Sequence, residues 1–536
     1  MNNKKSSLMV QGAILAFAGI ITKIIGFVYR IPMANMLGEQ GNGIYSVAFG
    51  IYNVALTLSS YSLPLALSKL TSERLAKNCS KNAYLLFKRA LIFAVIAGLC
   101  AFCVLFFGAE WLEALYGRAG LTHPLKVLAP TTFIVALLGV FRGYFQGHSN
   151  MVPTALSQIV EQIINAVVSV LATWLFMKSF SSSAMGAAGA TLGTLAGAFG
   201  ALVMLSLFFM SRLSYIKASV KKDYAAPEKK AYSYKEIILT MIPIILSQTA
   251  FQISFTVDDL IFGNVMAAKG FSDEVISSLQ GVFNTQYSGL VNLPIAIVTA
   301  LAASALPEIA RLFTKGEHAE MNSKTSSVIK LAMAVTLPSA VGLTVLARPI
   351  MTLLFPSLVT YRETAIRLMA FGSIGCVVYS LSIITTSVLQ GNGKMKEPVI
   401  NALISFLFHT ALIYVLLKFT DLGVYARLIA DIAFPIVIAL LNCACLKERT
   451  GYKLKFKETF FKPILISLFM GIVTYALYFI VNMLSKSILI SLIFSLPFAV
   501  LVYGVLILTS EYFGDGELTE LPMGRTLLRI KKKIKR

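Results

Sequence analysis

Two hydrophobic stretches, about 230 residues apart, each contain a charged residue followed five positions later by an asparagine. The first stretch has Arg30 and Asn35, and the second has Asp259 and Asn264. An arginine at the centre of a bilayer is disfavoured by roughly 2.5–3.5 kcal/mol on insertion scales, so a charge that persists there faces a partner or a watery cavity. Because the two charges have opposite signs, we predict two repeated halves that face one another across a polar space.

Each charge shares a predicted helix face with other residues that suit a polar lining. The spacing i, i+4, i+7, i+11 places residues on one face of a helix. Two sets have this spacing: Gly19, Lys23, Gly26 and Arg30, and Gln248, Gln252, Phe255 and Asp259. We expect both faces to point inward. Lys23 and Arg30 would then bind an anionic group, with Asp259 as counter-charge or gate. The alternative is that Arg30 and Asp259 simply pair and hold the halves together.

Other polar residues in apolar stretches extend this predicted cavity. Arg142 and Glu161 could form an ion pair, and Glu161 could instead carry a proton, since either arrangement satisfies a buried carboxylate. The cavity residues that we predict are Lys23, Asn53, Arg142, Gln252, Asp259 and Gln286 together with Arg30. The residues that we predict for ion coupling or gating are Glu161, Asp258, Asp259 and Asp431.

The composition indicates what kind of protein positions these residues. Of the 536 residues, 57% are hydrophobic and only 13% are charged, which no soluble domain of this length matches. Apolar stretches long enough to cross about 30 Å of hydrocarbon must be helices, because backbone polar groups cannot stay unpaired in lipid. We predict an all-α membrane protein with about fourteen transmembrane helices, at 10–37, 43–68, 85–107, 125–145, 153–177, 184–210, 237–266, 279–305, 328–347, 365–389, 398–418, 423–445, 461–484 and 487–509.

The distribution of positive charge predicts the topology. The formal charge of +22 could suggest a nucleic-acid partner, but the basic residues gather in alternate connections between the predicted spans. This pattern is the positive-inside rule, so we expect no nucleic acid, a multi-pass protein of the plasma membrane, and both termini in the cytoplasm. The basic segment from Arg525 to Arg536 would be attracted to anionic lipid headgroups.

Internal similarity divides the chain into two parallel repeats and an appended hairpin. The stretch from Gln146 to Pro153 is echoed from Gln390 to Pro398, and Leu63-Pro64 is echoed by Leu306-Pro307. Repeats with an even number of spans share one topology, which is typical of transporters that rock one half against the other. The predicted parts are a six-helix bundle (1–216), a cytoplasmic linker (217–234), a second six-helix bundle (235–446), two additional transmembrane helices (447–510) and a basic cytoplasmic tail (511–536).

Several motifs of enzymes and metal proteins are missing from the sequence. Gly391-Asn-Gly-Lys394 is too short for a nucleotide-binding G-x-x-x-x-G-K-[ST] loop, and no HExxH motif, nucleophile elbow or metal-spaced Cys/His cluster occurs. We therefore expect a carrier without enzymatic activity, cofactor or resident metal, driven by an ion gradient, the membrane potential or the gradient of its own substrate. A row of glycines from Gly186 to Gly200 indicates close helix packing rather than ligand binding.

Three motifs resemble one branch of a known superfamily. They are Lys23-Ile-Ile-Gly26-Phe27-Val-Tyr-Arg30 with Gly43-Ile-Tyr45, Phe141-Arg-Gly-Tyr-Phe-Gln146-Gly147, and Pro153-Thr-Ala-Leu-Ser-Gln158-Ile-Val-Glu161-Gln162. Together they resemble the stage V sporulation protein B branch of the multidrug/oligosaccharidyl-lipid/polysaccharide flippase superfamily, over nearly the whole chain.

The resemblance implies a V-shaped pair of six-helix bundles. It also implies translocation of a lipid-linked cell-wall precursor, with lipid II first, to the outer leaflet by alternating access. Peptidoglycan-precursor flippases of the sister branch carry a basic-x-x-Gly-Phe-x-Arg pattern, which Lys23, Gly26 and Phe27 match. Tyr29 occupies the position of the Arg in that pattern, and Arg30 comes one position later. The resemblance therefore implies a substrate contact for Lys23 more directly than for Arg30. In those relatives the two extra helices form a groove for the lipid tail.

Three functions stay open on the sequence. The first is flipping of lipid II or another undecaprenyl-linked polysaccharide precursor, in which the partners are the lipid-linked oligosaccharide, membrane lipids and cell-wall synthesis enzymes, and the chain acts as a monomer. The second is a cation-coupled multidrug exporter, which would favour an acidic cavity, whereas Lys23 and Arg30 are basic. The third is a non-transporting membrane scaffold, which would leave the polar faces unexplained.

Overall fold

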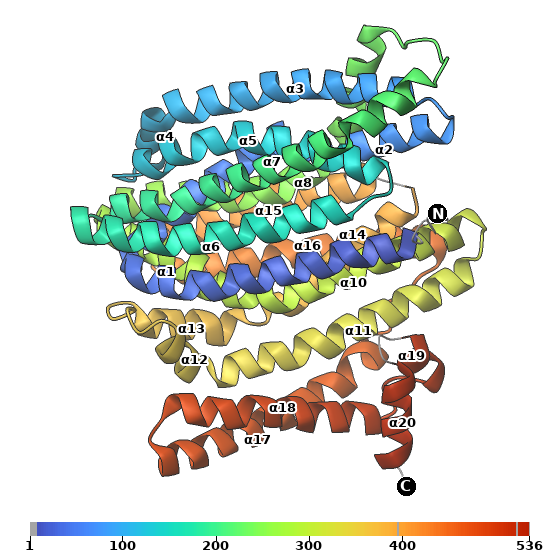
Figure 1. Ribbon diagram of the computed structural model, residues 1–536. Coiled ribbons are helices and arrows are strands. Elements are labelled where there is room, and N and C mark those ends of the chain that lie inside the picture. Colours follow the sequence, from blue (N-terminus) through green and yellow to red (C-terminus); the bar gives the residue numbers. More distant parts are fainter. Residues whose placement is uncertain (1–7, 394–395, 521–523, 535–536) are drawn as a thin grey trace. The chain divides into compact units, whose positions relative to one another are not determined.

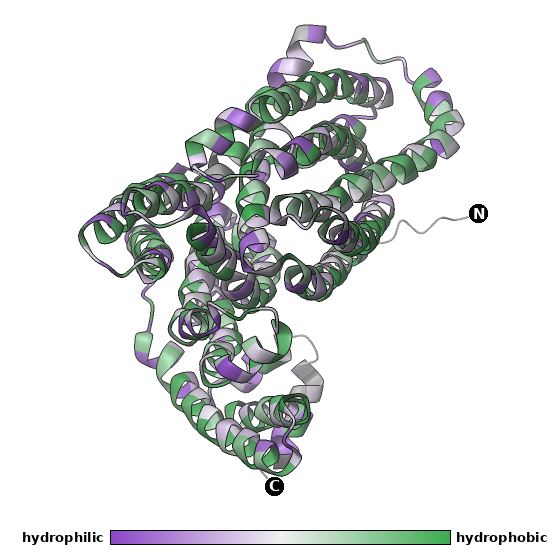
Figure 2. Cartoon of the chain, turned by 90° about the vertical axis from the view of Figure 1, so that its left-hand side faces the viewer, coloured by the Kyte–Doolittle hydropathy of each residue, from purple (hydrophilic) through white to green (hydrophobic). Residues whose placement is uncertain are grey.

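The described residues of the computed structural model, 8–393, 396–520 and 524–534, form helices joined by connections without strands (Figure 1). Within those ranges no strand occurs, which confirms the predicted all-α class. Figure 2 shows hydrophobic residues along the helices and hydrophilic residues in many of the connections. The chain forms two compact units, Met1–Gly281 and Val282–Arg536.

Nine helices make up the described part of the first unit. They are α1 (Leu8–Ser59), α2 (Leu63–Ala76), α3 (Ser80–Phe107), α4 (Ala109–Tyr116), α5 (Thr122–Gly147), α6 (Val152–Phe180), α7 (Ser183–Lys221), α8 (Lys230–Ala268) and α9 (Asp273–Gly281).

The second unit begins with a short π-helix that continues into a long α-helix. Its elements are η1 (Val282–Tyr287), α10 (Ser288–Thr314), α11 (His318–Val345), α12 (Ala347–Leu354), α13 (Arg362–Gly372), α14 (Gly375–Gly391), α15 (Lys396–Phe419), α16 (Val424–Thr450), η2 (Lys457–Phe461), α17 (Lys462–Ser485), α18 (Ile488–Thr509), α19 (Asp515–Glu520) and α20 (Gly524–Ile534).

Helix α1 consists of two arms that meet at Gly38. This glycine has φ 67° and ψ −172°, a conformation that a residue with a Cβ rarely adopts. The Arg30 guanidinium carbon nevertheless lies 5.8 Å from the ring centroid of Phe49. Nineteen residues of straight helix would span about 28 Å, so the chain must turn back at Gly38. The first arm corresponds to the predicted span 10–37, whereas the predicted span 43–68 covers most of the second arm, the turn after Ser59 and the start of α2.

The predicted count of fourteen spans is not confirmed. Eleven helical stretches of the described residues are long and apolar enough to cross a membrane, or up to twelve if one bent pair counts as a span. Phe17–Ala76 counts once although it covers two predicted spans, and α8 is not among the eleven. The bent pair is α13 and α14, which meet at 46° inside the predicted span 365–389.

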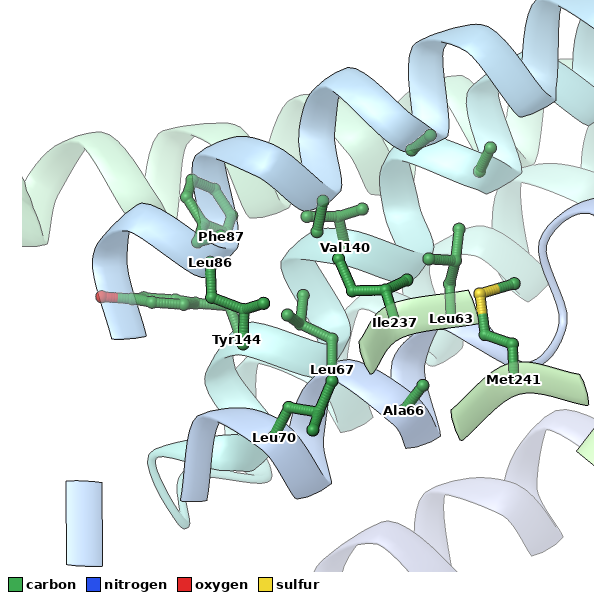
Figure 3. Close-up of a cluster of buried hydrophobic side chains, with 13 residues drawn as sticks. Leu63, Ala66, Leu67, Leu70, Leu86, Phe87, Val140, Tyr144, Ile237 and Met241 are labelled. Carbon is green, nitrogen blue, oxygen red and sulfur yellow. The ribbon is translucent and has the colours of Figure 1, made fainter. Parts of the chain in front are cut away.

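The core of the first unit joins helices that are far apart in the sequence (Figure 3). Leu63, Leu67, Phe87 and Tyr144, from α2, α3 and α5, pack with Ile237 of α8 in one buried cluster. Phe87 also lies 4.7 Å from Tyr144, measured between ring centroids. This cluster attaches the start of α8 to the helices of the predicted first repeat.

Helices α6 and α7 approach each other closely through the predicted glycine row. A Cβ at Gly189 would lie 2.6 Å from the Ala172 carbonyl oxygen, and one at Gly197 would lie 2.5 Å from that of Glu161. Only glycine allows such an approach of two backbones. The prediction of close packing is therefore confirmed, and the contact places the Glu161 turn of α6 against α7.

The connection between α7 and α8 is fastened to α2 and α3. Arg74 is 5% exposed and pairs with Glu228 and Glu236, each at 2.6 Å. Asp223 accepts hydrogen bonds from the backbone N–H groups of Lys81 and Ala225, and these donors hold the pKa of Asp223 below its usual range. The carboxylate is thus ionised near neutral pH, where it keeps the connection on α3.

The compact units do not divide the chain where the repeat predicts. The predicted linker was 217–234, but α7 continues to Lys221, α8 begins at Lys230, and the boundary between units falls after Gly281. Helices α8 and α9 pack on α1, and Arg74 fastens the start of α8, so both helices group with the first unit. The sequence repeat itself stays a prediction.

The appended hairpin, α17 and α18, packs on α11 in the second unit. A Cβ at Gly471 would lie 2.5 Å from a methyl group of Val341. The hydroxyl of Tyr512 lies 2.8 Å from the Thr459 carbonyl oxygen and 3.1 Å from that of Lys330, and its single hydrogen is donated to this pair of acceptors. The hairpin is therefore joined to its unit by close packing and by the segment that follows it.

Candidate functional site

The first arm of α1 carries two exposed basic side chains on one face. Lys23 and Arg30 are seven residues apart, and both are exposed. Between them, a Cβ at Gly26 would lie 3.1 Å from Nε2 of Gln162, so α1 approaches α6 at this turn. Gln162 follows Glu161 directly, which brings the basic face of α1 close to the polar turn of α6.

Aromatic residues of both arms of α1 lie close to Arg30. Its guanidinium carbon lies over the Phe49 ring of the second arm, and its side chain forms a hydrogen bond with that of Tyr29 on the first arm. The Tyr45 and Phe49 rings are stacked, with centroids 5.7 Å apart. A guanidinium has five N–H donors, so the contacts with Tyr29 and Phe49 orient Arg30 and leave other donors for an anion.

Arg142 and Glu161 form the ion pair that was one of two predicted alternatives. Nη2 of Arg142 lies 2.6 Å from Oε2 of Glu161, and Nε donates to the Ser157 hydroxyl at 3.1 Å. Their side chains are 14% and 27% exposed. Arg142 is thus a neutralised cation here, in contrast to Lys23. The role of Glu161 in proton coupling stays a prediction.

Asp258 and Asp259 are buried in α8, at 2% and 4% exposure. The carbonyl oxygen of Asp259 accepts a hydrogen bond from Nε2 of Gln280 at 2.9 Å. Oε1 of Gln280 accepts one from Arg118, and Arg118 also pairs with Asp273 at 2.7 Å. The chain of contacts joins the loop after α4 to α8 and α9.

Arg118 was absent from the predicted site, although it is only 2% exposed. In the sequence it lies among loop residues, and 155 positions separate it from Asp273. No periodicity connects residues so far apart. Arg30 and Asp259 lie in the same compact unit, and their predicted direct pairing stays a prediction.

Two predicted cavity residues have less definite surroundings. Asn53 and Gln252 are half-buried. Their backbone carbonyl groups accept hydrogen bonds from the hydroxyls of Thr57 and Thr256 within the same helices. Gln248 belongs to the predicted polar face, but its side chain lies outside the described residues.

The second unit holds a buried polar cluster beside the π-helix η1. Gln286 is 1% exposed, and its Oε1 has no hydrogen-bond partner among the described residues. Arg427 of α16 is fully buried: it donates to Oδ1 of Asn284 at 2.9 Å and lies 4.3 Å from the Phe283 ring centroid. Short π-helices occur frequently at functional sites.

Asp431 joins this cluster from the next turn of α16. It accepts a hydrogen bond of 2.8 Å from the Tyr379 hydroxyl of α14. Arg427 and Asp431 are four residues apart and share a helix face. The sequence prediction included Asp431 and Gln286 but missed Arg427. An arginine inside an apolar span, one turn before a predicted carboxylate, was the signal available.

The two clusters differ in the chemistry they offer. In the first unit, Lys23 and Arg30 present exposed positive charge that suits an anionic group. In the second, the charges of Arg427 and Asp431 are buried among hydrogen-bond partners. The first cluster is therefore the better candidate for contact with a large polar ligand.

Two family profiles match the sequence. One is described as polysaccharide biosynthesis protein and matches residues 9–313. The other is described as MatE and matches residues 243–415. The first match covers more than half of the chain and includes every candidate residue of the first unit.

Two relatives from Bacillus subtilis (strain 168) match most of the chain. The lipid II flippase MurJ is 25% identical over 465 residues, which are 84% of this chain and 84% of the relative. Stage V sporulation protein B is 26% identical over 456 residues, or 85% of this chain and 86% of the relative.

Solved structures share the fold at low sequence identity. An inward-facing multidrug resistance MATE family transporter of the MOP superfamily has a TM-score of 0.69 and 17% identity, over 83% of this chain and 98% of the other. The lipid II flippase MurJ in an inward closed conformation has a TM-score of 0.66 and 18% identity, over 92% and 98%.

Proposed function

The chain belongs to the polysaccharide biosynthesis protein family and is a flippase of the MOP superfamily, and we propose that it moves a lipid-linked cell-wall precursor, with lipid II first, to the outer leaflet. The family and the fold are those of membrane transporters and not of enzymes. The relative named as a lipid II flippase supports this choice of substrate.

The exposed basic face of α1 is the observation that carries the proposal. A lipid-linked sugar has an anionic pyrophosphate headgroup, which cannot cross hydrocarbon, and a long tail, which need not leave it. Lys23 and Arg30 provide two cationic groups on one side of a spanning helix. Arginine and lysine bind phosphate oxygens through charge and hydrogen bonds, without a catalytic group.

The proposed cycle is alternating access with both termini in the cytoplasm. The energy comes from an ion gradient or the membrane potential, and Glu161, Asp258, Asp259 and Asp431 are the proposed coupling or gating groups. We expect the protein to act as a monomer and to supply its product to cell-wall synthesis enzymes.

The test is a flipping assay in proteoliposomes with fluorescent lipid II and a membrane-impermeant quencher. We expect Lys23→Ala and Arg30→Ala each to lower the flipping rate at least about tenfold, because each removes a charged contact to the headgroup. Lys178→Ala is the matched control: it removes an exposed lysine from the last turn of α6, beside Trp174, and should leave the rate unchanged.

Normal flipping by the double variant Lys23→Ala/Arg30→Ala would overturn the cationic-face mechanism. An unrelated undecaprenyl-linked sugar, assayed in the same vesicles, tests the substrate. Equal flipping rates for both lipids would show that the substrate is a broader class of undecaprenyl-linked precursors and not lipid II in particular.

A cation-coupled multidrug exporter is the second candidate. The MatE match over residues 243–415 favours it, as does the fold shared with a multidrug transporter. Export of a cationic dye under an imposed sodium or proton gradient, without lipid II flipping, would establish this function instead.

A further inference from the structure

A cavity of about 260 Å³ lies in the first unit, apart from the basic face of α1. It is formed where α2 and α5 end, where α3 and α6 begin, and along the last turns of α7. Its polar lining comes mainly from Tyr144, His148, Asn150, Arg212, Tyr215 and Ser219. The lining residues include one arginine and one histidine but neither Asp nor Glu. We refer to this cavity as the α7 pocket.

Arg212 brings a positive charge without a counter-ion to the α7 pocket. The side chain is exposed, and within the described part of the chain it makes no hydrogen bond or ion pair. A guanidinium offers five N–H donors in a planar fork that matches phosphate oxygens. An arginine that lines a cavity and lacks a protein partner is therefore well suited to an anionic ligand.

His148 contributes an imidazole to the lining of the α7 pocket. Its Nδ1 lies 2.9 Å from the Tyr144 carbonyl oxygen, which can only accept, so Nδ1 carries the hydrogen. The imidazole and the Tyr144 ring are held together, with centroids 4.3 Å apart. Burial lowers the pKa of His148, so near neutral pH the ring is neutral and Nε2 accepts a hydrogen bond, as from a hydroxyl group of the headgroup.

The surroundings of the pocket favour a negative ligand. Lys217 and Lys221 follow Arg212 on α7, Lys222 comes directly after the helix, and all three are exposed. Two carboxylates of the connection that follows α7 have partners of their own: Asp223 accepts from the backbone N–H groups of Lys81 and Ala225, and Glu228 pairs with Arg74. Cationic side chains at a membrane surface attract anionic lipids by about 1 kcal/mol each.

Aromatic residues give the pocket an amphipathic wall. Phe145, Phe208, Tyr144 and Tyr215 line it, and Tyr215 is 76% exposed. Tyrosine is enriched at the level of lipid headgroups, where a ring meets hydrocarbon and its hydroxyl meets water. The volume is just below the range of ordinary ligand sites, which suits a headgroup rather than a whole lipid.

We propose that the α7 pocket binds the phosphate-bearing headgroup of an anionic membrane lipid, with Arg212 as its charge partner and His148 as a second polar contact. The site is separate from Lys23 and Arg30, and its ligand is a component of the bilayer rather than the transported substrate. It does not depend on which precursor the protein flips.

The test is a binding titration of the purified full-length protein with dioctanoyl-phosphatidylglycerol, followed by native mass spectrometry. We expect Arg212→Gln to weaken binding at least about tenfold, because a charged hydrogen bond is lost. Lys217→Gln is the matched control: it removes the same charge from the same helix at an exposed position that does not line the pocket. Its affinity should stay within about twofold of the unsubstituted protein.

A second variant tests the contribution of the cavity's space to binding separately from that of its charge. Ser219→Phe fills the α7 pocket without changing any charge, and we expect it to abolish specific binding. Equal weakening by Arg212→Gln and Lys217→Gln would overturn the proposal in favour of diffuse attraction. Equal affinity for dioctanoyl-phosphatidylcholine would also overturn it. Displacement of the lipid by an equimolar amount of inorganic phosphate would show a site for soluble anions instead.

Discussion

At the scale of single residues, the basic groups of the first unit fall into two kinds. Lys23 and Arg30 are exposed, and Arg30 lies against aromatic rings. Arg142 instead pairs with Glu161 and with the Ser157 hydroxyl. A cation that is not held by a carboxylate can exchange water for a ligand, whereas one in an ion pair must first give up its carboxylate. The surroundings therefore separate binding residues from structural ones, although all are basic residues in apolar spans.

We predict that Arg142→Ala lowers the free energy of unfolding by about 1–3 kcal/mol, because it leaves the partly buried Glu161 carboxylate without its partner. The range is discounted for the 14% and 27% exposure of the two side chains. The double variant Arg142→Ala/Glu161→Ala should recover part of that loss. Thermal unfolding of the purified variants in detergent measures both effects.

The flipping rates of these variants decide whether the Arg142–Glu161 pair also acts in transport. If the pair is only structural, the double variant should regain both stability and flipping. A double variant that is stable but inactive would contradict the purely structural role and would show that Arg142, the proposed coupling group Glu161, or both take part in transport.

At the scale of elements, close contacts of α9 with the second arm of α1 hold the first unit together. A Cβ at Gly43 would overlap the carbonyl oxygen of Ser277, and one at Gly281 would overlap that of Glu39. The Arg118 contacts with Asp273 and Gln280 lie on the same helix α9. Backbones at this distance leave no room for any side chain, so α1 and α9 are fitted to each other at these two glycines.

We predict that Gly43→Ala destabilises the protein by about 1–3 kcal/mol, because the new methyl group forces the two backbones apart. Gly19→Ala is the matched control on the same helix, since a Cβ there would meet nothing within 4 Å. Alanine favours a helix over glycine by about 1 kcal/mol, so the control should be neutral or slightly stabilising. The measurement is the midpoint of thermal unfolding. Equal midpoints for the two variants would show that α9 can move aside.

The connection between α7 and α8 is an element in its own right. The paired contacts of Arg74 with Glu228 and Glu236 cross more than 150 positions of the sequence. Arg89 adds hydrogen bonds to the Glu228 carbonyl and the Ser233 hydroxyl. From its composition alone, a charged segment that contains a proline would be predicted to be a flexible linker. Here its polar groups are satisfied by α2 and α3, so the segment is ordered on the first unit.

At the scale of the whole molecule, the helices match a multi-pass membrane protein, and charge predicts which ends face the cytoplasm. Basic residues follow α7 and precede α8, whereas the connection from α8 to α9 contains a single lysine, Lys269. Since α8 has 39 residues, it is long enough to separate the two connections by a bilayer.

We predict that Tyr224→Cys and Phe271→Cys lie on opposite sides of the membrane. Both side chains are exposed, at 97% and 45%, so a thiol at either position is accessible. In a variant without the native cysteines, a membrane-impermeant maleimide should label Phe271→Cys in intact protoplasts. Tyr224→Cys should react only after permeabilisation, because the positive-inside rule places it in the cytoplasm. The reverse pattern would invert the predicted topology.

The sequence by itself determined the helical class, the approximate spans, the glycine row between α6 and α7, and the polar residues worth attention. Hydrophobic length and helical spacing are local properties, and lipid allows few ways to satisfy a backbone. The count of fourteen spans is not confirmed, because length alone cannot place the turn at Gly38 or the bend between α13 and α14.

Only the tertiary structure decided which of these residues meet. It brought Arg30 over Phe49, Arg118 against Asp273, and the buried Arg427 beside Asn284, and it grouped α8 and α9 with the first unit. Arg118 and Arg427 lie more than 140 positions from these partners, so no periodicity in the chain connects them. Such contacts depend on how the helices pack, and packing depends on the shapes of many side chains at once.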